Sequence, residues 1–157
     1  MPRSAPIPTR RCIHLVDIEN LLGGWVTDQR TRDLVARYHS TGLIGSADLI
    51  IVAGAHRAAA RWAFAAPQGW RRIITDDEPD AADDALVKAG QAYAFSPTTH
   101  LVIGSGDHYF VPVAQTARAA GAQIHGLIGE GQLAPRLAVL FDAMTQIALR
   151  IRPRPVL

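Results

Sequence analysis

Three aspartates occupy positions from which their carboxylates could act on one ligand. Asp17 ends an apolar run, Asp107 follows another, and Asp83 lies in the first turn of the helix expected after a third. Because the carboxyl ends of parallel strands meet at one edge of a sheet, we expect these side chains to converge there. Crowded carboxylates repel one another unless a cation or bound protons neutralise them. Hard oxygen ligands favour Mg²⁺ or Mn²⁺ over zinc, so the pattern predicts a magnesium or manganese site.

Each aspartate also has a purely structural interpretation, which the sequence leaves open. Asp17 at a strand end, and Asp107 after a Ser-Gly pair, could cap the helices that follow them. Asp83, in the first turn of a helix, could simply complement the helix dipole. Each position alone is a weak indicator, and it is the shared edge of the sheet that favours a functional site.

Other patterns that place aspartates or glycines in similar positions fit the sequence less well. The segment Gly104-Ser105-Gly106 begins a dinucleotide-binding fingerprint, but Tyr109 stands where the third glycine is needed. A haloacid-dehalogenase-type phosphatase needs a second aspartate where Glu19 stands. A response-regulator receiver needs an acidic pair on the first strand, and a P-loop needs a glycine-rich lysine motif, and the sequence has neither.

The elements that must position these residues alternate between strands and helices. Apolar runs with β-branched residues predict strands, and apolar residues at helical spacing predict helices. The expected strands are 12–18, 48–53, 71–75, 100–104, 123–128 and 146–151. The expected helices are 21–25, 31–41, 56–65, 81–95, 108 to about 120, and 135–141. This alternation predicts a three-layer α-β-α sandwich around a mostly parallel sheet of five or six strands.

The composition of the 157-residue chain, with 48% hydrophobic and 19% charged residues, fits one domain with a substantial core. We expect a flexible basic N-terminus over 1–11, a folded domain over 12–151 and a flexible tail over 152–157. Cys12 is the only cysteine, which excludes an intramolecular disulfide and a thiolate-based zinc site. The sequence has no signal-peptide-like run and no apolar segment of membrane-spanning length, so we expect a cytoplasmic protein without a membrane partner.

The positive charge of the chain is carried almost entirely by arginine. The formal net charge is +2, and Lys88 is the only lysine. Guanidinium groups suit phosphate, although a GC-rich genome would also favour arginine over lysine. The charge pattern therefore permits an anionic partner and favours a phosphate-bearing one only slightly.

Three segments together resemble the motifs of NYN domains, which belong to the PIN-like ribonuclease superfamily. Val16-Asp17-Ile18-Glu19-Asn20-Leu21 resembles the opening V-D-x-x-N motif. Ala82-Asp83-Asp84-Ala85-Leu86 is similar to the second, a lysine-glycine-x-aspartate sequence followed by an apolar helix. Ser105-Gly106-Asp107-His108-Tyr109-Phe110-Val111-Pro112 is similar to the third and most specific motif, S-G-D-x-D-F-x-P. The order and spacing fit, and the similarity covers roughly residues 12–150.

The resemblance implies a PIN-like fold and a ribonuclease that depends on Mg²⁺ or Mn²⁺. It makes Asp17, Asp83 and Asp107 the metal ligands, and Asn20 the catalytic polar residue that orients a ligand, a water or a phosphate. RNA in single-stranded form is the implied partner, and the sequence leaves a homodimer open. The residues expected to contact RNA are Arg57, Arg61, His108 and Ser105. Trp25 or Trp62 could stack on bases, although packing inside the protein is the favoured interpretation of both.

Two departures from the family pattern bear on catalysis. Tyr109 replaces the second aspartate of the third motif, and Ala81-Ala82 replaces the lysine-glycine pair of the second. Asp80, Asp84 or Glu19 could supply the missing carboxylate. The main alternative to a ribonuclease is therefore a catalytically weak NYN-like module that binds RNA or a protein. A phosphohydrolase acting on small phosphoesters is a third interpretation.

Overall fold

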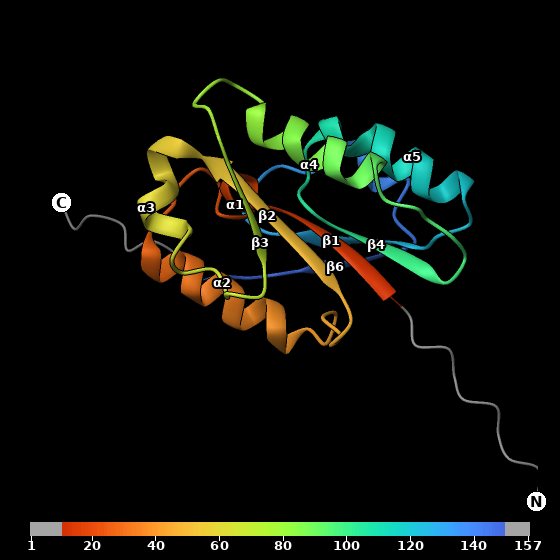
Figure 1. Ribbon diagram of the computed structural model, residues 1–157, viewed down its shortest axis with the longest axis horizontal. Helices are drawn as coiled ribbons and strands as arrows, with labels where there is room; N and C mark the ends of the chain where they lie inside the picture. The colour runs from red at the N-terminus through yellow and green to blue at the C-terminus, as the bar shows by residue number, and fades with distance from the viewer. Residues whose placement is uncertain (1–10, 150–157) are drawn as a thin grey trace, which may run out of the picture.

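A six-stranded sheet with helices on both faces forms the body of the computed structural model, which describes residues 11–149 (Figure 1). All strands run parallel, in the order β3-β2-β1-β4-β5-β6. The strands are β1 (Arg11–Asp17), β2 (Leu49–Ala55), β3 (Arg71–Thr75), β4 (Thr99–Gly104), β5 (Ile124–Ile128) and β6 (Ala143–Gln146). The termini expected to be flexible, 1–11 and 152–157, lie outside the described residues except for Arg11, which begins β1.

Helices form the two outer layers, which confirms the expected α-β-α sandwich. In Figure 1, α4 and α5 lie on one face of the sheet and α2 and α3 lie on the other. The three longer helices are α2 (Asp28–Ser40), α4 (Ala81–Gln91) and α5 (Val111–Ala119). The short ones are α1 (Ile18–Leu21), α3 (Ala59–Trp62), α6 (Pro135–Ala138), and the 3-10 helices η1 (His56–Ala58) and η2 (His108–Phe110).

Two hydrophobic clusters, one on each face, fix the central strands in place. On the α2 and α3 side, Tyr38 and Trp62 are fully buried against the sheet. On the α4 and α5 side, Leu86 and Phe110 are fully buried. Because β1 contributes side chains to both clusters, its alternating residues are buried on both faces, as is usual for the centre of a parallel sheet.

The strand order reverses between β1 and β4, which makes a switch point in the sheet. These two strands are hydrogen-bonded neighbours, with Val16 opposite Gly104. The chain leaves them toward opposite flanks, so a crevice is expected beyond their carboxyl ends. Asp17 ends β1, and the Ser105–Asp107 turn follows β4. The fold therefore brings two of the three motifs to the place where open parallel sheets usually bind ligands.

The helix expected over 56–65 is shorter in the structure. It is divided into η1 and α3 and ends at Trp62. The guanidinium of Arg72, on β3, donates hydrogen bonds to the carbonyl oxygens of Ala63, Ala66 and Trp70. A longer helix could not pair the carbonyl of Ala63, because Pro67, four residues on, has no N–H, and Arg72 satisfies this carbonyl instead.

The last strand was expected over 146–151, of which 150–151 lie outside the described residues. The structure places it earlier, because β6 spans Ala143–Gln146 and no strand follows over 147–149. Asp142 fixes where the strand begins. Its backbone N–H donates to the carbonyl of Ile124, and its carboxylate accepts from the N–H of Ile124, both at 2.8 Å. This pairing with β5 starts the strand directly after the α6 region, a tertiary constraint that the local sequence pattern does not reveal.

Candidate metal centre

Asp17 is a buried carboxylate held from two sides at the end of β1. Its side chain is 4% exposed. One carboxylate oxygen accepts from the backbone N–H of Asn20 (3.3 Å), and the other accepts from the hydroxyl of Ser105 (3.0 Å). Burial raises the pKa of Asp17 above its ordinary value, although hydrogen bonds with Asp83, Asn20 and Ser105 oppose the rise. Asp17 therefore caps α1, as one interpretation of the sequence allowed, and also contacts another acid.

Asn20 ties the end of β1 to the turn that follows β4. Its side-chain oxygen accepts from the backbone N–H of Gly106 at 2.9 Å. The turn needs glycine here, because a Cβ on Gly106 would lie 2.1 Å from the carbonyl oxygen of Gln132. The hydroxyl of Ser105 accepts from the N–H of Asp107 at 3.1 Å. Asn20 therefore orients the turn that carries Asp107.

Asp83 shows the electrostatic cost of gathering acids at this edge. It lies in the first turn of α4 and is 8% exposed. Burial, followed by the negative charges of Asp17, Asp107 and Asp80, raises the pKa of Asp83 to about 9. Without a cation this carboxyl keeps its proton at neutral pH and hydrogen-bonds Asp17. The site thus has more negative charge than its own donors neutralise.

One group of acids is spaced so that it could hold a metal ion, and it contains Asp80 where the sequence predicted Asp17. Oxygens of Asp80, Asp83 and Asp107 all lie within 4.8 Å of one another, a spacing at which they could hold a metal ion. Asp80 precedes α4 in the left-handed region of the backbone, with φ of 63°, which aspartate tolerates better than most residues. Among the candidates to supply a further carboxylate, Asp80 joins Asp83 and Asp107, and Glu19 lines the same cavity but accepts from the N–H of Ala55. Asp84 instead forms an ion pair with Lys88, at 2.9 Å.

All four residues expected to form the catalytic site line a single open cavity of about 350 Å³. These residues are Asp17, Asn20, Asp83 and Asp107. Other acids complete the walls: Glu19, Asp76, Asp77, Glu78 and Asp80. Among the described residues that line the cavity, Arg57 is the only basic one. Crowded carboxylate oxygens in an open cavity fit a hard divalent cation such as Mg²⁺ or Mn²⁺ better than a soft one.

The residues expected to contact RNA fall into different environments. Arg57 lines the cavity, and its backbone N–H donates to Asp77 at 2.8 Å. His108 is exposed, with its Nδ1 3.4 Å from a carboxylate oxygen of Asp107. Arg61 is exposed on α3 but lies outside the residues that line the cavity. Ser105 is fully buried, and its hydroxyl donates to the carboxylate of Asp17 and accepts from the backbone N–H of Asp107.

The two tryptophans considered for base stacking are held by the protein itself. Trp62 is fully buried under the sheet. Trp25 is half-buried, and the guanidinium of Arg30 lies 4.2 Å from the centre of its ring. Arg30 is itself buried and donates to the carbonyls of Trp25 and Leu22 and to Glu130. These contacts agree with the interpretation of both rings as packing residues.

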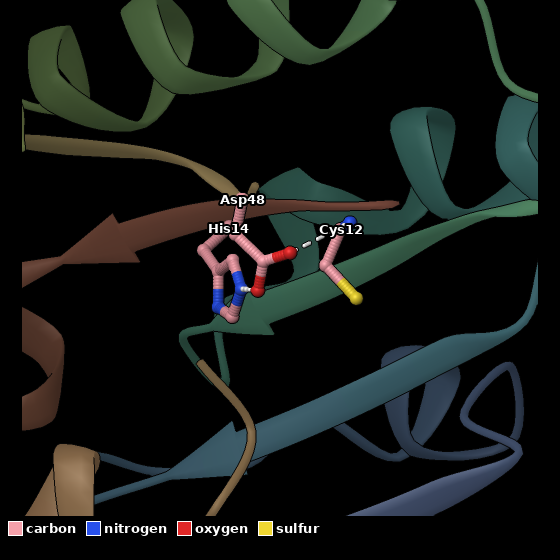
Figure 2. Close-up of side chains that lie close together, drawn as sticks. All are labelled: Cys12, His14 and Asp48. Atoms are coloured by element: carbon pink, nitrogen blue, oxygen red, sulfur yellow. Dashed lines mark hydrogen bonds and ion pairs between the residues drawn. The ribbon is translucent and has the colours of Figure 1, made fainter. Parts of the chain in front are cut away.

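A second group of potential ligands lies at the opposite, amino ends of the strands. Figure 2 shows Cys12 and His14 of β1 beside Asp48, which directly precedes β2. One carboxylate oxygen of Asp48 accepts from the N–H of Cys12 (3.1 Å). The other lies 2.8 Å from Nε2 of His14 and accepts from the N–H of Gly45 (2.7 Å).

Internal hydrogen bonds already satisfy this second group. Burial lowers the pKa of His14, which keeps its imidazole neutral. A neutral ring beside a carboxylate donates from Nε2 to Asp48, so Nδ1, 2.5 Å away from the hydroxyl of Tyr38, accepts from that hydroxyl. The sequence predicted a structural role for His14, but Asp48 as its partner, 34 residues away, was not foreseen.

Comparisons with known proteins add no assignment to this geometry. No family model matches the chain, and no curated protein matches it.

Among the described residues, no helix has both the length and the apolar character needed to cross a membrane.

Proposed function

We propose that this protein is an endoribonuclease that uses Mg²⁺ or Mn²⁺ to hydrolyse phosphodiester bonds of single-stranded RNA. The observation that supports it best is that Asp17, Asp83 and Asp107, from three separate segments, line one cavity. The raised pKa of Asp83 adds to this support, because it reports negative charge that a cation would relieve. The resemblance of the same three segments to NYN motifs supplies the reaction class.

In this proposal, some residues of the cavity are ligands of the cation, and others hold these ligands in position. Asp80, Asp83 and Asp107 would hold the cation, and Asp17 shares the proton that Asp83 must release when a cation binds. Asn20 and Ser105 fix the orientations of Asp107 and Asp17 through the turn after β4. When bound, the cation supplies Lewis-acid polarisation of the phosphodiester and acidifies water. Arg57, which lines the cavity, would contact an RNA phosphate.

Tyr109 favours a second candidate function, a catalytically weak module that binds RNA or a protein. In the NYN motif that this segment resembles, an acidic residue stands at this position. Tyr109 is 37% exposed and lies two residues after Asp107. Asp80 offsets the loss by joining Asp83 and Asp107, so we rank the enzyme first.

The decisive experiment compares RNA cleavage in two matched variants. We expect the wild-type protein to cut single-stranded RNA with Mn²⁺ and to stop when EDTA removes the ion. Asp107→Asn should lower the rate by roughly a hundredfold or more, since it removes a ligand of the charge-stabilising cation. Asp84→Asn is the matched control, because Asp84 pairs with the exposed Lys88 instead of lining the cavity.

Three outcomes separate the alternatives. RNA binding without cleavage under any divalent cation would reject the enzyme and favour the binding module. Hydrolysis of a simple aryl phosphate, with intact RNA, would favour the phosphohydrolase. Equal loss of activity in Asp84→Asn and Asp107→Asn would contradict the assignment of the site itself.

A further inference from the structure

A second cavity of about 360 Å³ opens next to the acidic one and has a different character. Its walls come from α4, η2, the start of α5, and α6. Its main lining residues are Val87, Gln91, His108, Tyr109, Pro112 and Arg136. Among the described residues that line it there is no acid, whereas acids dominate the neighbouring cavity. We call this second cavity the Tyr109 groove.

The Tyr109 groove and the acidic cavity lie along one face of the same helix, α4. Asp83, Val87 and Gln91 are spaced four residues apart on α4, so they form one stripe that begins in the acidic cavity and ends in the groove. Each step along this stripe advances about 6 Å. On the facing wall, the backbone N–H of Tyr109 donates to Asp107 at 2.9 Å. A ligand held at Asp83 and Asp107 therefore has the groove directly beside it.

The chemistry of the groove matches an unpaired nucleobase. A base has flat apolar faces and a polar edge, and it stacks on aromatic side chains. Tyr109 supplies an exposed ring, while Val87 and Pro112 supply apolar walls. Gln91 can donate to and accept from the polar edge of a base, and Arg136 brings positive charge for a phosphate.

We infer that the Tyr109 groove binds one unpaired base of an RNA strand whose neighbouring phosphate lies at the acidic cavity. This inference rests on the proposed function, because it takes RNA as the strand. It gives Tyr109 a role of its own. Tyr109 replaces the second aspartate of the motif that the segment resembles, and its ring would supply a stacking surface instead. The inference also predicts a preference for single-stranded RNA, since a base inside a duplex is already stacked and paired and cannot enter the groove.

The first test measures the affinity of short single-stranded RNA by fluorescence anisotropy in Ca²⁺. Ca²⁺ is a hard ion and should therefore occupy the acidic cavity. Its looser coordination geometry should disfavour cleavage of the RNA during the measurement. Tyr109→Ala should weaken binding roughly tenfold to a hundredfold, the usual effect of losing one stacked base. Tyr109→Phe keeps the ring and should bind nearly as well as wild type. Phe64→Ala removes a more exposed ring outside the groove and should change nothing.

A second measurement locates the base. An abasic nucleotide moved along the RNA should weaken binding by wild type at one position, and Tyr109→Ala should be insensitive to it there. RNA that contains 5-iodouridine should form a photo-crosslink to Tyr109. The inference is overturned if Tyr109→Ala binds RNA as tightly as wild type. It is also overturned if the losses of binding free energy caused by Tyr109→Ala and by the abasic nucleotide are additive.

The inference and the proposed function fail in distinguishable ways. If Tyr109→Ala loses affinity and the abasic effect disappears, but no cleavage is found with Mg²⁺ or Mn²⁺, the groove stands and the enzyme proposal falls. If Mn²⁺-dependent cleavage is found with a KM that Tyr109→Ala leaves unchanged, the enzyme stands and the groove falls. A protein that binds no RNA, or a dimer that dissociates on Tyr109→Ala, overturns the groove as a base site.

Discussion

Acidic residues at the two ends of the sheet have opposite surroundings. At the carboxyl ends of the strands, Asp80, Asp83 and Asp107 face one another in an open cavity, and burial with mutual repulsion raises the pKa of Asp83. At the amino ends, the carboxylate of Asp48 is surrounded by donors from Cys12, His14 and Gly45. Among the described residues that line the first cavity, Arg57 is the only basic one, so the acids there outnumber the cations. In the second group, the hydrogen bonds of Asp48 and of His14 are already made within the protein.

The difference shows that closeness of potential ligands does not by itself indicate a metal site. Oxygen, nitrogen and sulfur atoms of Cys12, His14 and Asp48 meet the same 4.8 Å spacing as the acidic group. Yet the hydrogen bonds of Asp48 and of both ring nitrogens of His14 are already made within the protein. At the amino ends, a cation could bind only if those hydrogen bonds were broken. At the carboxyl ends, a cation would instead relieve the repulsion between the carboxylates of Asp80, Asp83 and Asp107.

The sharpest test of this contrast removes the acid from the complete group. Asp48→Ala leaves the buried His14 and two backbone N–H groups without their acceptor, and should lower the free energy of unfolding by about 1–3 kcal/mol for each buried donor left unpaired. Urea unfolding at neutral pH measures it. Asp84→Ala, which loses only an exposed ion pair, should cost no more than about 0.5 kcal/mol. A small effect of Asp48→Ala, or a full rescue by Zn²⁺, would contradict a complete hydrogen-bonded cluster.

A smaller effect should follow from adding a cation. Mn²⁺ at about a hundred times its dissociation constant should raise the free energy of unfolding by about 2.7 kcal/mol, because it binds only the folded acidic cavity. Thermal unfolding at constant ionic strength measures the change. Asp83→Asn should abolish it, whereas Asp84→Asn should keep it. Equal stabilisation of both variants would mean that Mn²⁺ binds elsewhere.

The sequence predicted the fold well because the signals for it are local. Apolar β-branched runs marked the buried strands, and the third strand was predicted with the bounds 71–75 that the structure shows. The carboxyl-end rule then placed Asp17, Asp83 and Asp107 around one cavity. These successes need only periodicity and the topology of parallel sheets.

Features that depend on tertiary contacts were beyond the sequence. Asp80 joins the acidic group through a left-handed backbone turn, and no local pattern distinguishes it from the other acids in its loop. The partnership of Asp48 with His14 depends on how the loop before β2 meets β1. The start of β6 depends on Asp142 pairing with β5. In each case the deciding hydrogen bond or close approach joins residues whose proximity exists only after folding.

The least of the expected effects is a pH dependence that the acidic cavity should show without a cation. Above the ordinary pKa of aspartate, native Asp83 keeps a proton up to about pH 9 that the unfolded chain has already lost. Unfolding then releases this proton, so the free energy of unfolding should fall as the pH rises, by at most about 1.4 kcal/mol per pH unit.

Urea unfolding of wild type and of Asp83→Asn in EDTA, between about pH 7 and pH 8.5, measures this effect as the difference between the two proteins, because they share the other groups that titrate in this range. Asp83→Asn carries no titrating proton at this position, so its stability should vary less with pH and exceed that of wild type at the upper end. Parallel curves for the two proteins would show that Asp83 is not held protonated. The cavity would then not have the excess of negative charge that distinguishes it from the Asp48 cluster.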